Sequence, residues 1–191
     1  MCGQKNILIT GLPGIGKTTA IKKLAEGLKE LGPEGFYTAE IREGAERQGF
    51  ELIGLDGSRG LLSHVGIKSN YRVGRYGVAL GDFEKFLDAL MLARPKTRVI
   101  IIDEIGKMEC LSQRFKAVVR SVLDSETPVI ATVALKGAGF IAEVKNRGDI
   151  KLLEMTAGNR AALPVEIAGY VREILKASGQ EDRNQSNRMN G

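Results

Sequence analysis

Histidine, cysteine and tryptophan are almost missing from this sequence. Its 191 residues include one histidine, two cysteines and no tryptophan. Cys2 and Cys110 stand far apart and His64 stands alone, so neither the ligand spacing of a zinc site nor a disulfide framework is present. We therefore expect reduced thiols in a cytoplasmic protein, with Cys110 serving in packing.

Long hydrophobic runs and aromatic clusters are also missing. The apolar run near the start, Ile7–Ile9, is far too short for a signal-peptide core or a membrane span, so we expect no membrane partner. The net charge is +5, but the basic residues are spread along the chain and aromatics make up only 5%. Nucleic-acid binders usually show clustered basic residues or aromatic platforms. Nucleic acid therefore stays open as a partner without being favoured, and we expect a monomer.

What the chain does contain is an alternation of short apolar runs with amphipathic helical segments, typical of one α/β domain. The apolar run Arg98–Asp103 is continuous, as in a parallel strand covered on both faces. We therefore predict a three-layer α/β/α fold with a mainly parallel sheet. The expected strands are Asn6–Thr10, Arg98–Asp103, Pro128–Ala134 and Ile150–Met155; the expected helices cover 16–31, 83–91 closed by Pro95, a segment capped by Ser112, 139–147 and a last one near Pro164.

Residues 35–80 depart from that alternation. Phe36–Arg42 and Gln48–Leu55 are strand-like and joined by a turn containing Gly44, which predicts a β-hairpin after the first helix. A third strand-like stretch, Tyr71–Leu80, follows a glycine-rich loop holding Ser58–Gly60. We expect a β-rich excursion within a single domain of residues 1–177. Residues 178–191 are nearly devoid of apolar residues, so we expect a disordered polar tail there.

The strongest motif follows the first expected strand. Residues 11–18, G-L-P-G-I-G-K-T, match the phosphate-loop pattern G-x-x-x-x-G-K-[ST] and lie between an apolar strand and an amphipathic helix. Lys17 is placed to reach the β- and γ-phosphates, and the Thr18 hydroxyl is a ligand for Mg²⁺. The predicted nucleotide-binding residues are Gly11, Leu12, Pro13, Gly14, Ile15, Gly16, Lys17, Thr18 and Thr19.

A second motif ends the expected strand Arg98–Asp103. An aspartate at the carboxyl end of a buried strand lies beside the phosphate loop, where Asp103 can hold Mg²⁺ through water. Glu104 suits a carboxylate that orients or deprotonates an attacking water, the alternative being a solvated residue at a strand end. Asp103 and Gly106 also match the D-x-x-G of GTPases, but the chain has no N-K-x-D guanine motif.

With both motifs in place, the chain resembles the THEP1-type nucleoside-triphosphatases. The most specific match is D-E-I-G-K-M-E, with weaker ones at 35–42, 58–60, 72–74 and 145–147, and the resemblance covers about residues 5 to 175. It implies slow hydrolysis of ATP, GTP, CTP and UTP to the diphosphate and phosphate. It also implies a second nucleotide-contacting segment formed by Asp103, Glu104, Ile105, Gly106, Lys107, Met108 and Glu109.

Several residues keep two interpretations. The resemblance implies a phosphate or catalytic role for Lys107, the alternative being no such role. Arg147 either stabilises transition-state charge or forms a surface salt bridge. Asn159 and Arg160 follow the last strand, where they either contact the base or start a helix. The arginines of the excursion cover the phosphates or stay in solvent; they are Arg59, Arg72 and Arg75.

Together these residues predict attack of water on the γ-phosphorus of a nucleoside triphosphate, with Lys17, Glu104 and Lys107 as catalytic residues. Thr18 and Asp103 hold the metal, and Glu104 positions the water. A nucleotide or nucleoside kinase is the first alternative, although it needs an acceptor pocket, usually with several arginines. A nucleotide-dependent binding module acting with nucleic acid is the second. No motif identifies the preferred base.

Overall fold

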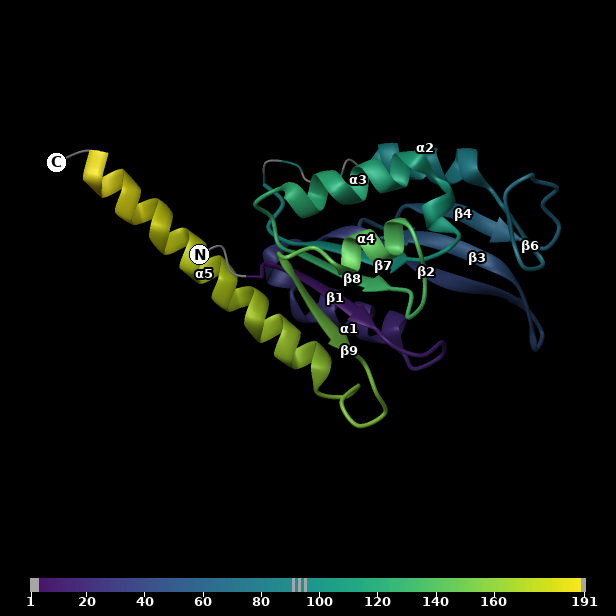
Figure 1. The fold of residues 1–191 in the computed structure, drawn as a ribbon, viewed down its shortest axis with the longest axis horizontal. Coiled ribbons are helices and arrows are strands. Elements are labelled where there is room, and N and C mark those ends of the chain that lie inside the picture. The colour runs from purple at the N-terminus through teal and green to yellow at the C-terminus, as the bar shows by residue number, and fades with distance from the viewer. Residues whose placement is uncertain (1–3, 91, 93, 95, 190–191) are drawn as a thin grey trace.

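A computed structural model describes residues 4–90, 92, 94 and 96–189. In that part of the chain the strands form one nine-stranded sheet, ordered β5-β6-β4-β3-β2-β7-β8-β1-β9 (Figure 1). The strands are β1 (Asn6–Thr10), β2 (Glu34–Glu43), β3 (Glu46–Gly54), β4 (Arg59–His64), β5 (Arg72–Val73), β6 (Tyr76–Val78), β7 (Ile100–Ile105), β8 (Val129–Val133) and β9 (Ile150–Glu154).

The half of the sheet from β2 to β9 is parallel and covered on both faces, as predicted. The pairs β2–β7, β7–β8, β8–β1 and β1–β9 all run parallel. On one face the buried residues of β1 pack with α1 (Lys17–Gly27) and α5 (Leu163–Met189). On the other they pack with α2 (Leu80–Leu90), α3 (Gln113–Asp124) and α4 (Phe140–Lys145). Figure 1 shows the resulting three layers.

The excursion after the first helix continues the same sheet. Strands β2 and β3 form the predicted antiparallel hairpin, and β4, β6 and β5 extend it by further antiparallel pairs. The sheet is therefore mixed, and the expected parallel pairing holds for the half that carries the phosphate loop. The excursion strands thus belong to the same sheet as the phosphate loop's strand, and the single domain of residues 1–177 stays a prediction.

Two expectations within the excursion are wrong in detail. The segment that begins at Arg59 was expected in a loop but forms β4, because Gly60 lets the strand lie against the Phe86 ring; an added Cβ would sit 3.0 Å from that ring. The stretch 71–80 was expected to be one strand. It is instead two short strands and the start of α2, since Gly74, with φ of 59°, allows a tight turn between β5 and β6.

Capping explains where α3 begins. The Ser112 side chain accepts a hydrogen bond from the Phe115 backbone N–H at 3.0 Å, as the sequence predicts for an N-cap serine. The first helix ends at Gly27 and is followed by a 3₁₀ turn over Lys29–Leu31, so the predicted helix 16–31 is divided in two. Pro95, the predicted end of the next helix, lies outside the described residues.

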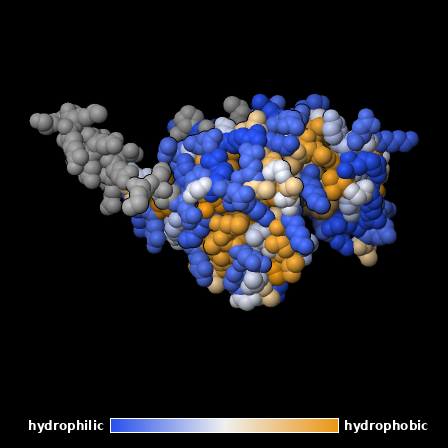
Figure 2. Space-filling model, viewed as in Figure 1, coloured by the Kyte–Doolittle hydropathy of each residue, from blue (hydrophilic) through white to orange (hydrophobic). Residues whose placement is uncertain are grey.

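Polar and charged residues cover most of the surface seen in Figure 2, and apolar residues appear between them as separate patches. Among the described residues, no helix combines the length and apolar character needed to cross a membrane.

The last helix extends beyond the apolar part of its sequence. Helix α5 continues to Met189, so its backbone is helical through most of the segment for which the sequence predicts disorder. Figure 1 shows this end of α5 projecting past the body of the domain. Residues 190 and 191 lie outside the described residues. That the segment adds little to the stability of the domain stays a prediction from its lack of apolar side chains.

Deleting residues 178–191 should therefore leave the domain intact. Without apolar anchors the segment contributes little to the free energy of unfolding, and we expect a change in melting temperature below about 2 °C. Thermal unfolding and phosphate release, measured on full-length and shortened chains, test this. A loss of several degrees or of turnover would show that the segment docks on the domain.

Candidate functional site

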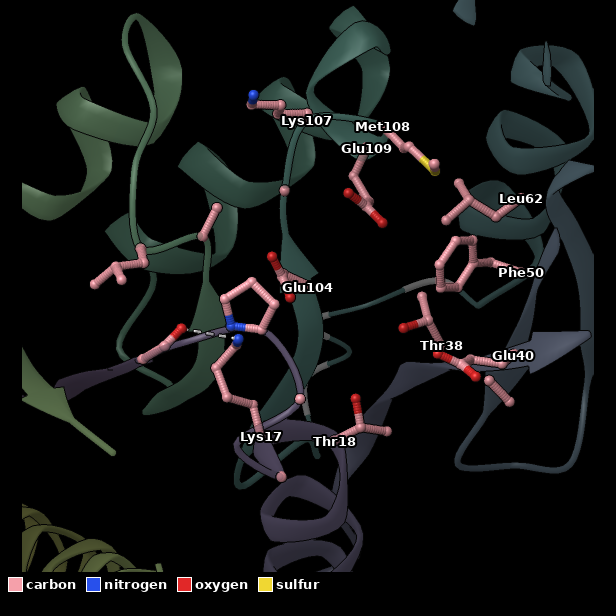
Figure 3. Close-up of a pocket in the computed structure, with 18 of the residues that line it drawn as sticks. Lys17, Thr18, Thr38, Glu40, Phe50, Leu62, Glu104, Lys107, Met108 and Glu109 are labelled. Atoms are coloured by element: carbon pink, nitrogen blue, oxygen red, sulfur yellow. Dashed lines mark hydrogen bonds between the residues drawn. The ribbon is translucent and has the colours of Figure 1, made fainter. Parts of the chain in front are cut away.

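A pocket of about 820 Å³ opens where the carboxyl ends of β1, β7 and β8 meet strand β2 (Figure 3). Open α/β sheets bind their ligands at this edge. One side of the pocket is the phosphate loop, and the opposite side is formed by the excursion strands. It is lined by Gly11, Leu12, Pro13, Gly14, Gly16, Lys17, Thr18, Thr19, Lys22, Thr38, Ala39, Glu40, Arg47, Phe50, Leu62, Val73, Glu104, Gly106, Lys107, Met108, Glu109, Ala134, Leu135 and Lys136.

The loop between β1 and α1 is shaped by its glycines. At Gly11 the backbone passes so close to β9 that an added Cβ would lie 2.6 Å from the Met155 carbonyl oxygen. Gly16, with φ of 108°, precedes α1, whose first turn has no side-chain cap and no acidic residue. The N–H groups of that turn are therefore left for an anion. The Lys17 ammonium donates to the carbonyl oxygens of Gly11 at 3.1 Å and Leu12 at 3.4 Å, which holds it over the loop.

Asp103 links the end of β7 to three neighbouring elements. Its carboxylate is 1% exposed and accepts hydrogen bonds from the hydroxyls of Thr18 at 2.7 Å and Thr38 at 3.4 Å. A third bond comes from the Thr132 hydroxyl on β8. The Thr18 hydroxyl and the Asp103 carboxylate thus form one oxygen pair beside the phosphate loop. Mg²⁺ is typically held by one or two such protein oxygens together with water and substrate phosphates, so these residues fit that ion.

Two further carboxyl groups, those of Glu104 and Glu109, line the same pocket. Burial raises the pKa of Glu104, and the Asp103 carboxylate adds to this, while the Lys17 ammonium works in the opposite direction. Glu109 is fully buried, and burial with the nearby charges of Glu104 and Asp103 raises its pKa to about 8 despite backbone hydrogen bonds that lower it. In Figure 3 the Glu104 carboxyl points into the pocket across from Lys17. Both carboxyl groups line the pocket and are therefore placed for proton chemistry beside the phosphate loop.

The predicted nucleotide-binding segment 103–109 contributes unevenly to the pocket. Glu104 and residues 106–109 line it. The side chain of Ile105 is fully buried, and Ile15 of the phosphate loop packs against the core, so their side chains are turned away from the pocket. Lys107 is exposed, and Figure 3 shows its amine at the rim of the pocket, away from Lys17.

Arg147 is not brought to this site. Its guanidinium pairs with Asp149 at 2.9 Å and Asp124 at 2.8 Å, next to the amino end of β9. Asn6, which starts β1, donates a hydrogen bond to the same Asp149. This cluster therefore lies at the amino end of the parallel strands, whereas the phosphate loop lies at their carboxyl end. Of the two interpretations of Arg147, the structure supports the salt bridge.

The remaining ambiguous residues also lie outside the pocket lining. Asn159 caps a turn, where its side chain accepts from the Thr156 N–H and donates to the Glu154 carbonyl, and Arg160 is exposed beside it. The excursion arginines bind other residues of the excursion. Arg59 pairs with Glu51, Arg72 donates to the Arg75 carbonyl, and Arg75 donates to the Arg47 carbonyl.

Several residues that line the pocket were not among the site residues predicted from the sequence. Lys22 lies one helical turn beyond Thr18 on α1, a spacing from which it could have been inferred. Thr38, Arg47 and Phe50 come from the excursion hairpin, and Lys136 follows β8. Thr38 lies in the 35–42 stretch that matches the family, although no role was assigned to it. No local motif marks Arg47, Phe50 or Lys136, because only the folding of distant segments brings them to the pocket.

Fold and site together define a class, the P-loop nucleoside-triphosphatases, and comparison with known proteins places the chain within it. A family model described as NTPase matches residues 6–168. The nucleoside-triphosphatase THEP1 of Thermotoga maritima is 47% identical over 87% of this chain and 95% of its own. The human cancer-related nucleoside-triphosphatase is 40% identical over 90% of this chain and 99% of its own.

A solved structure agrees with the sequence comparison. The crystal structure of THEP1 from Aquifex aeolicus has a TM-score of 0.78 and 34% sequence identity, covering 87% of this chain and 98% of that one. The chain therefore belongs to this NTPase family, which confirms the resemblance noted from D-E-I-G-K-M-E.

Replacing Arg147 with Ala separates its two interpretations. An arginine that stabilises transition-state charge is worth about 10³–10⁵ in rate. Because Arg147 lies at the opposite edge of the sheet, we expect kcat to stay within about threefold of wild type. Loss of its pairs with Asp149 and Asp124 should instead lower the free energy of unfolding by on the order of 1 kcal/mol. Arg147→Lys, which keeps the charge but not the planar fork, serves as the control. A thousandfold loss of kcat in the Ala variant would return Arg147 to the active site.

Proposed function

We propose that this protein is a Mg²⁺-dependent nucleoside-triphosphatase that hydrolyses ATP, GTP, CTP and UTP slowly to the diphosphate and phosphate. The observation that carries the proposal is the oxygen pair of Thr18 and Asp103, 2.7 Å apart, next to Lys17 and facing Glu104. The names of the relatives, all nucleoside-triphosphatases, agree with it.

The phosphates are bound by the loop and its lysine. The uncapped N–H groups at the start of α1 bind the β-phosphate, and the Lys17 ammonium exchanges its carbonyl partners for oxygens of the β- and γ-phosphates. Thr18, directly, and Asp103, through water, would hold Mg²⁺. When bound, the metal neutralises negative charge on the phosphate oxygens.

Hydrolysis follows from the position of Glu104. Its carboxylate orients a water molecule and accepts a proton from it as the oxygen attacks the γ-phosphorus. The bond from the γ-phosphorus to the bridging oxygen breaks, and the diphosphate leaves with its charge stabilised by Lys17 and the loop.

Broad base specificity and slow turnover are both supported by what lines the pocket. Among the described lining residues there is no Asn, Gln or Asp that would read the hydrogen-bonding edge of a base. The lining has a single arginine, Arg47, and it is paired with Glu40 at 2.8 Å. The site thus has no unpaired arginine among these residues to stabilise transition-state charge, a device that speeds related reactions by about 10³–10⁵.

A survey of nucleotides tests the proposed function. Phosphate release is measured with each of the four NTPs and the dNTPs, with Mg²⁺ and with excess chelator. We expect similar release from all bases, diphosphate as the other product, and no release without the metal. Lys17→Ala should lower turnover by on the order of 10²-fold or more while melting near wild type, because Lys17 contributes little to the core. Wild-type turnover in that variant would contradict the assignment of the phosphate loop.

Glu104→Gln separates catalysis from binding. Glutamine keeps the size and a hydrogen-bonding oxygen but cannot accept a proton, and general-base assistance is worth about 10²–10⁴ in rate. We expect kcat to fall by a factor in that range. The affinity for a non-hydrolysable Mg·NTP analogue should change by only about a few-fold. Single-turnover hydrolysis and equilibrium binding on one preparation measure the two effects. If hydrolysis survives nearly unchanged, the water is activated by another group, with Glu40, Glu109 or the γ-phosphate itself as the next candidates.

A further inference from the structure

The pocket extends well beyond the phosphate loop. Its volume of about 820 Å³ is near the upper end of the roughly 300–1,000 Å³ usual for pockets that enclose whole small molecules. This space takes the triphosphate of the donor and, beside it, the group that attacks the γ-phosphorus. The part of the pocket away from the phosphate loop has an apolar wall formed by Phe50, Leu62, Val73 and Met108. We call these four residues the far wall.

The far wall lies on the side from which a nucleophile attacks. The loop 11–16 surrounds the β-phosphate, so the bond that breaks points back into the loop. In-line attack on the γ-phosphorus must then come from the opposite side. Figure 3 shows Lys17 and the loop on one side of the pocket, Glu104 between, and Phe50, Leu62 and Met108 across from them.

Charge at the far wall argues against a second phosphate group. Arg47 is the arginine of this region, and its guanidinium bonds Glu40 at 2.8 Å and the Tyr76 hydroxyl at 3.0 Å. It also stacks over the Phe50 ring, 4.9 Å from the centroid. Arg47 shares the Glu40 carboxylate with Arg42, so both guanidinium groups are already engaged. The four residues of the far wall carry no charge themselves, and their surface therefore favours an uncharged part of a ligand.

The chemistry of the wall indicates a ring. Phe50 offers an aromatic surface, on which planar rings stack favourably. Leu62 and Met108 add apolar surface beside it, while the Thr38 hydroxyl and Glu40 carboxylate provide polar groups at its edge. A few polar groups around an apolar slot are what orient a small ligand. A flat, uncharged ring that carries hydroxyl groups satisfies each of these features.

We propose that the far wall is an acceptor subsite for a nucleoside, and that the protein transfers the γ-phosphoryl group to it. The nucleoside ring packs against Phe50, and a ribose hydroxyl takes the place of the attacking water. Its oxygen forms a bond to the γ-phosphorus as the bond to the bridging oxygen breaks, and its proton passes to the Glu104 carboxylate. The products are a nucleoside diphosphate from the donor and a phosphomonoester of the acceptor. The inference rests on the proposed function, because donor binding is the same in both reactions.

The experiment follows both products at once. The full-length protein is given Mg·ATP and, in separate reactions, adenosine, guanosine, cytidine, uridine or thymidine, and phosphorus NMR distinguishes inorganic phosphate from phosphomonoester. We expect a phosphomonoester with at least one nucleoside and less inorganic phosphate in the same reaction. Each nucleoside 5′-monophosphate is tested in parallel and should be a poorer acceptor.

Variants locate the subsite. Val73→Trp places a bulky ring in the slot from a short peripheral strand, and we expect the KM for the nucleoside to rise about tenfold or more. Inorganic phosphate release without nucleoside is measured on the same preparation, so that the change in nucleoside KM is compared with the variant's own rate of hydrolysis. Tyr71→Trp adds the same side chain in the same excursion, at a position that is 47% exposed and outside the pocket lining, and should change neither value. Phe50→Leu removes the aromatic surface and should also raise the nucleoside KM, which keeps the test open if Val73→Trp fails to fold.

The outcomes are distinct. Phosphate release without a phosphomonoester from any of the five nucleosides overturns the acceptor subsite and leaves hydrolysis standing. No phosphate release from any triphosphate overturns the proposed function itself. Transfer that is unaffected by both Val73→Trp and Phe50→Leu shows that the acceptor binds elsewhere, and preferred transfer to monophosphates contradicts an uncharged ligand.

Discussion

The buried carboxylate of Asp103 is the constraint on which the rest of the site depends. A carboxylate that is 1% exposed must have its oxygens satisfied, and here threonines from α1, β2 and β8 do so. The three hydroxyls fix where the phosphate-loop helix starts relative to the sheet. They also bring β2, the first strand of the excursion, to the same point. One group therefore ties the start of the phosphate-loop helix to the strand from which the excursion begins.

The two halves of the sheet contribute different parts of the site. The parallel strands supply the phosphate loop, the metal-binding oxygens and Glu104, all at their carboxyl ends. The antiparallel strands supply Phe50, Leu62 and Val73 of the far wall, and Met108 follows β7. Strand β2 belongs to both, since it pairs parallel with β7 over Glu34–Phe36 and antiparallel with β3 along its length. A single sheet thus holds a phosphate site and an apolar site facing one another without a domain boundary between them.

The sequence predicted correctly those parts of the molecule that depend on a few adjacent residues. The phosphate loop, the acidic end of β7, the hairpin and the Ser112 cap each depend on a few adjacent residues. Strand β4 was missed because Ser58 and Gly60 resemble a loop, whereas Gly60 is there to let the strand approach Phe86. Arg147 belonged to a matched motif, yet it lies at the wrong end of β9, since a motif does not fix which edge of the sheet a residue reaches. Arg47 and Phe50 carry no local signal, because strand pairing across the excursion brings them to the pocket.

Thr38 and Glu40 lie two residues apart on β2, and this spacing links the phosphate side of the pocket to the excursion side. Side chains two apart on a strand share a face, so inserting one residue before Thr38 would turn both away from the pocket at once. The carboxylate of Asp103 would lose a donor, and Arg47 would lose its partner. Additions at the hairpin tip around Gly44, beyond the bulge at Ile41/Arg42, leave that parity untouched. The root of this hairpin is therefore fixed in length, whereas residues can be added at its tip without turning Thr38 or Glu40 away from the pocket.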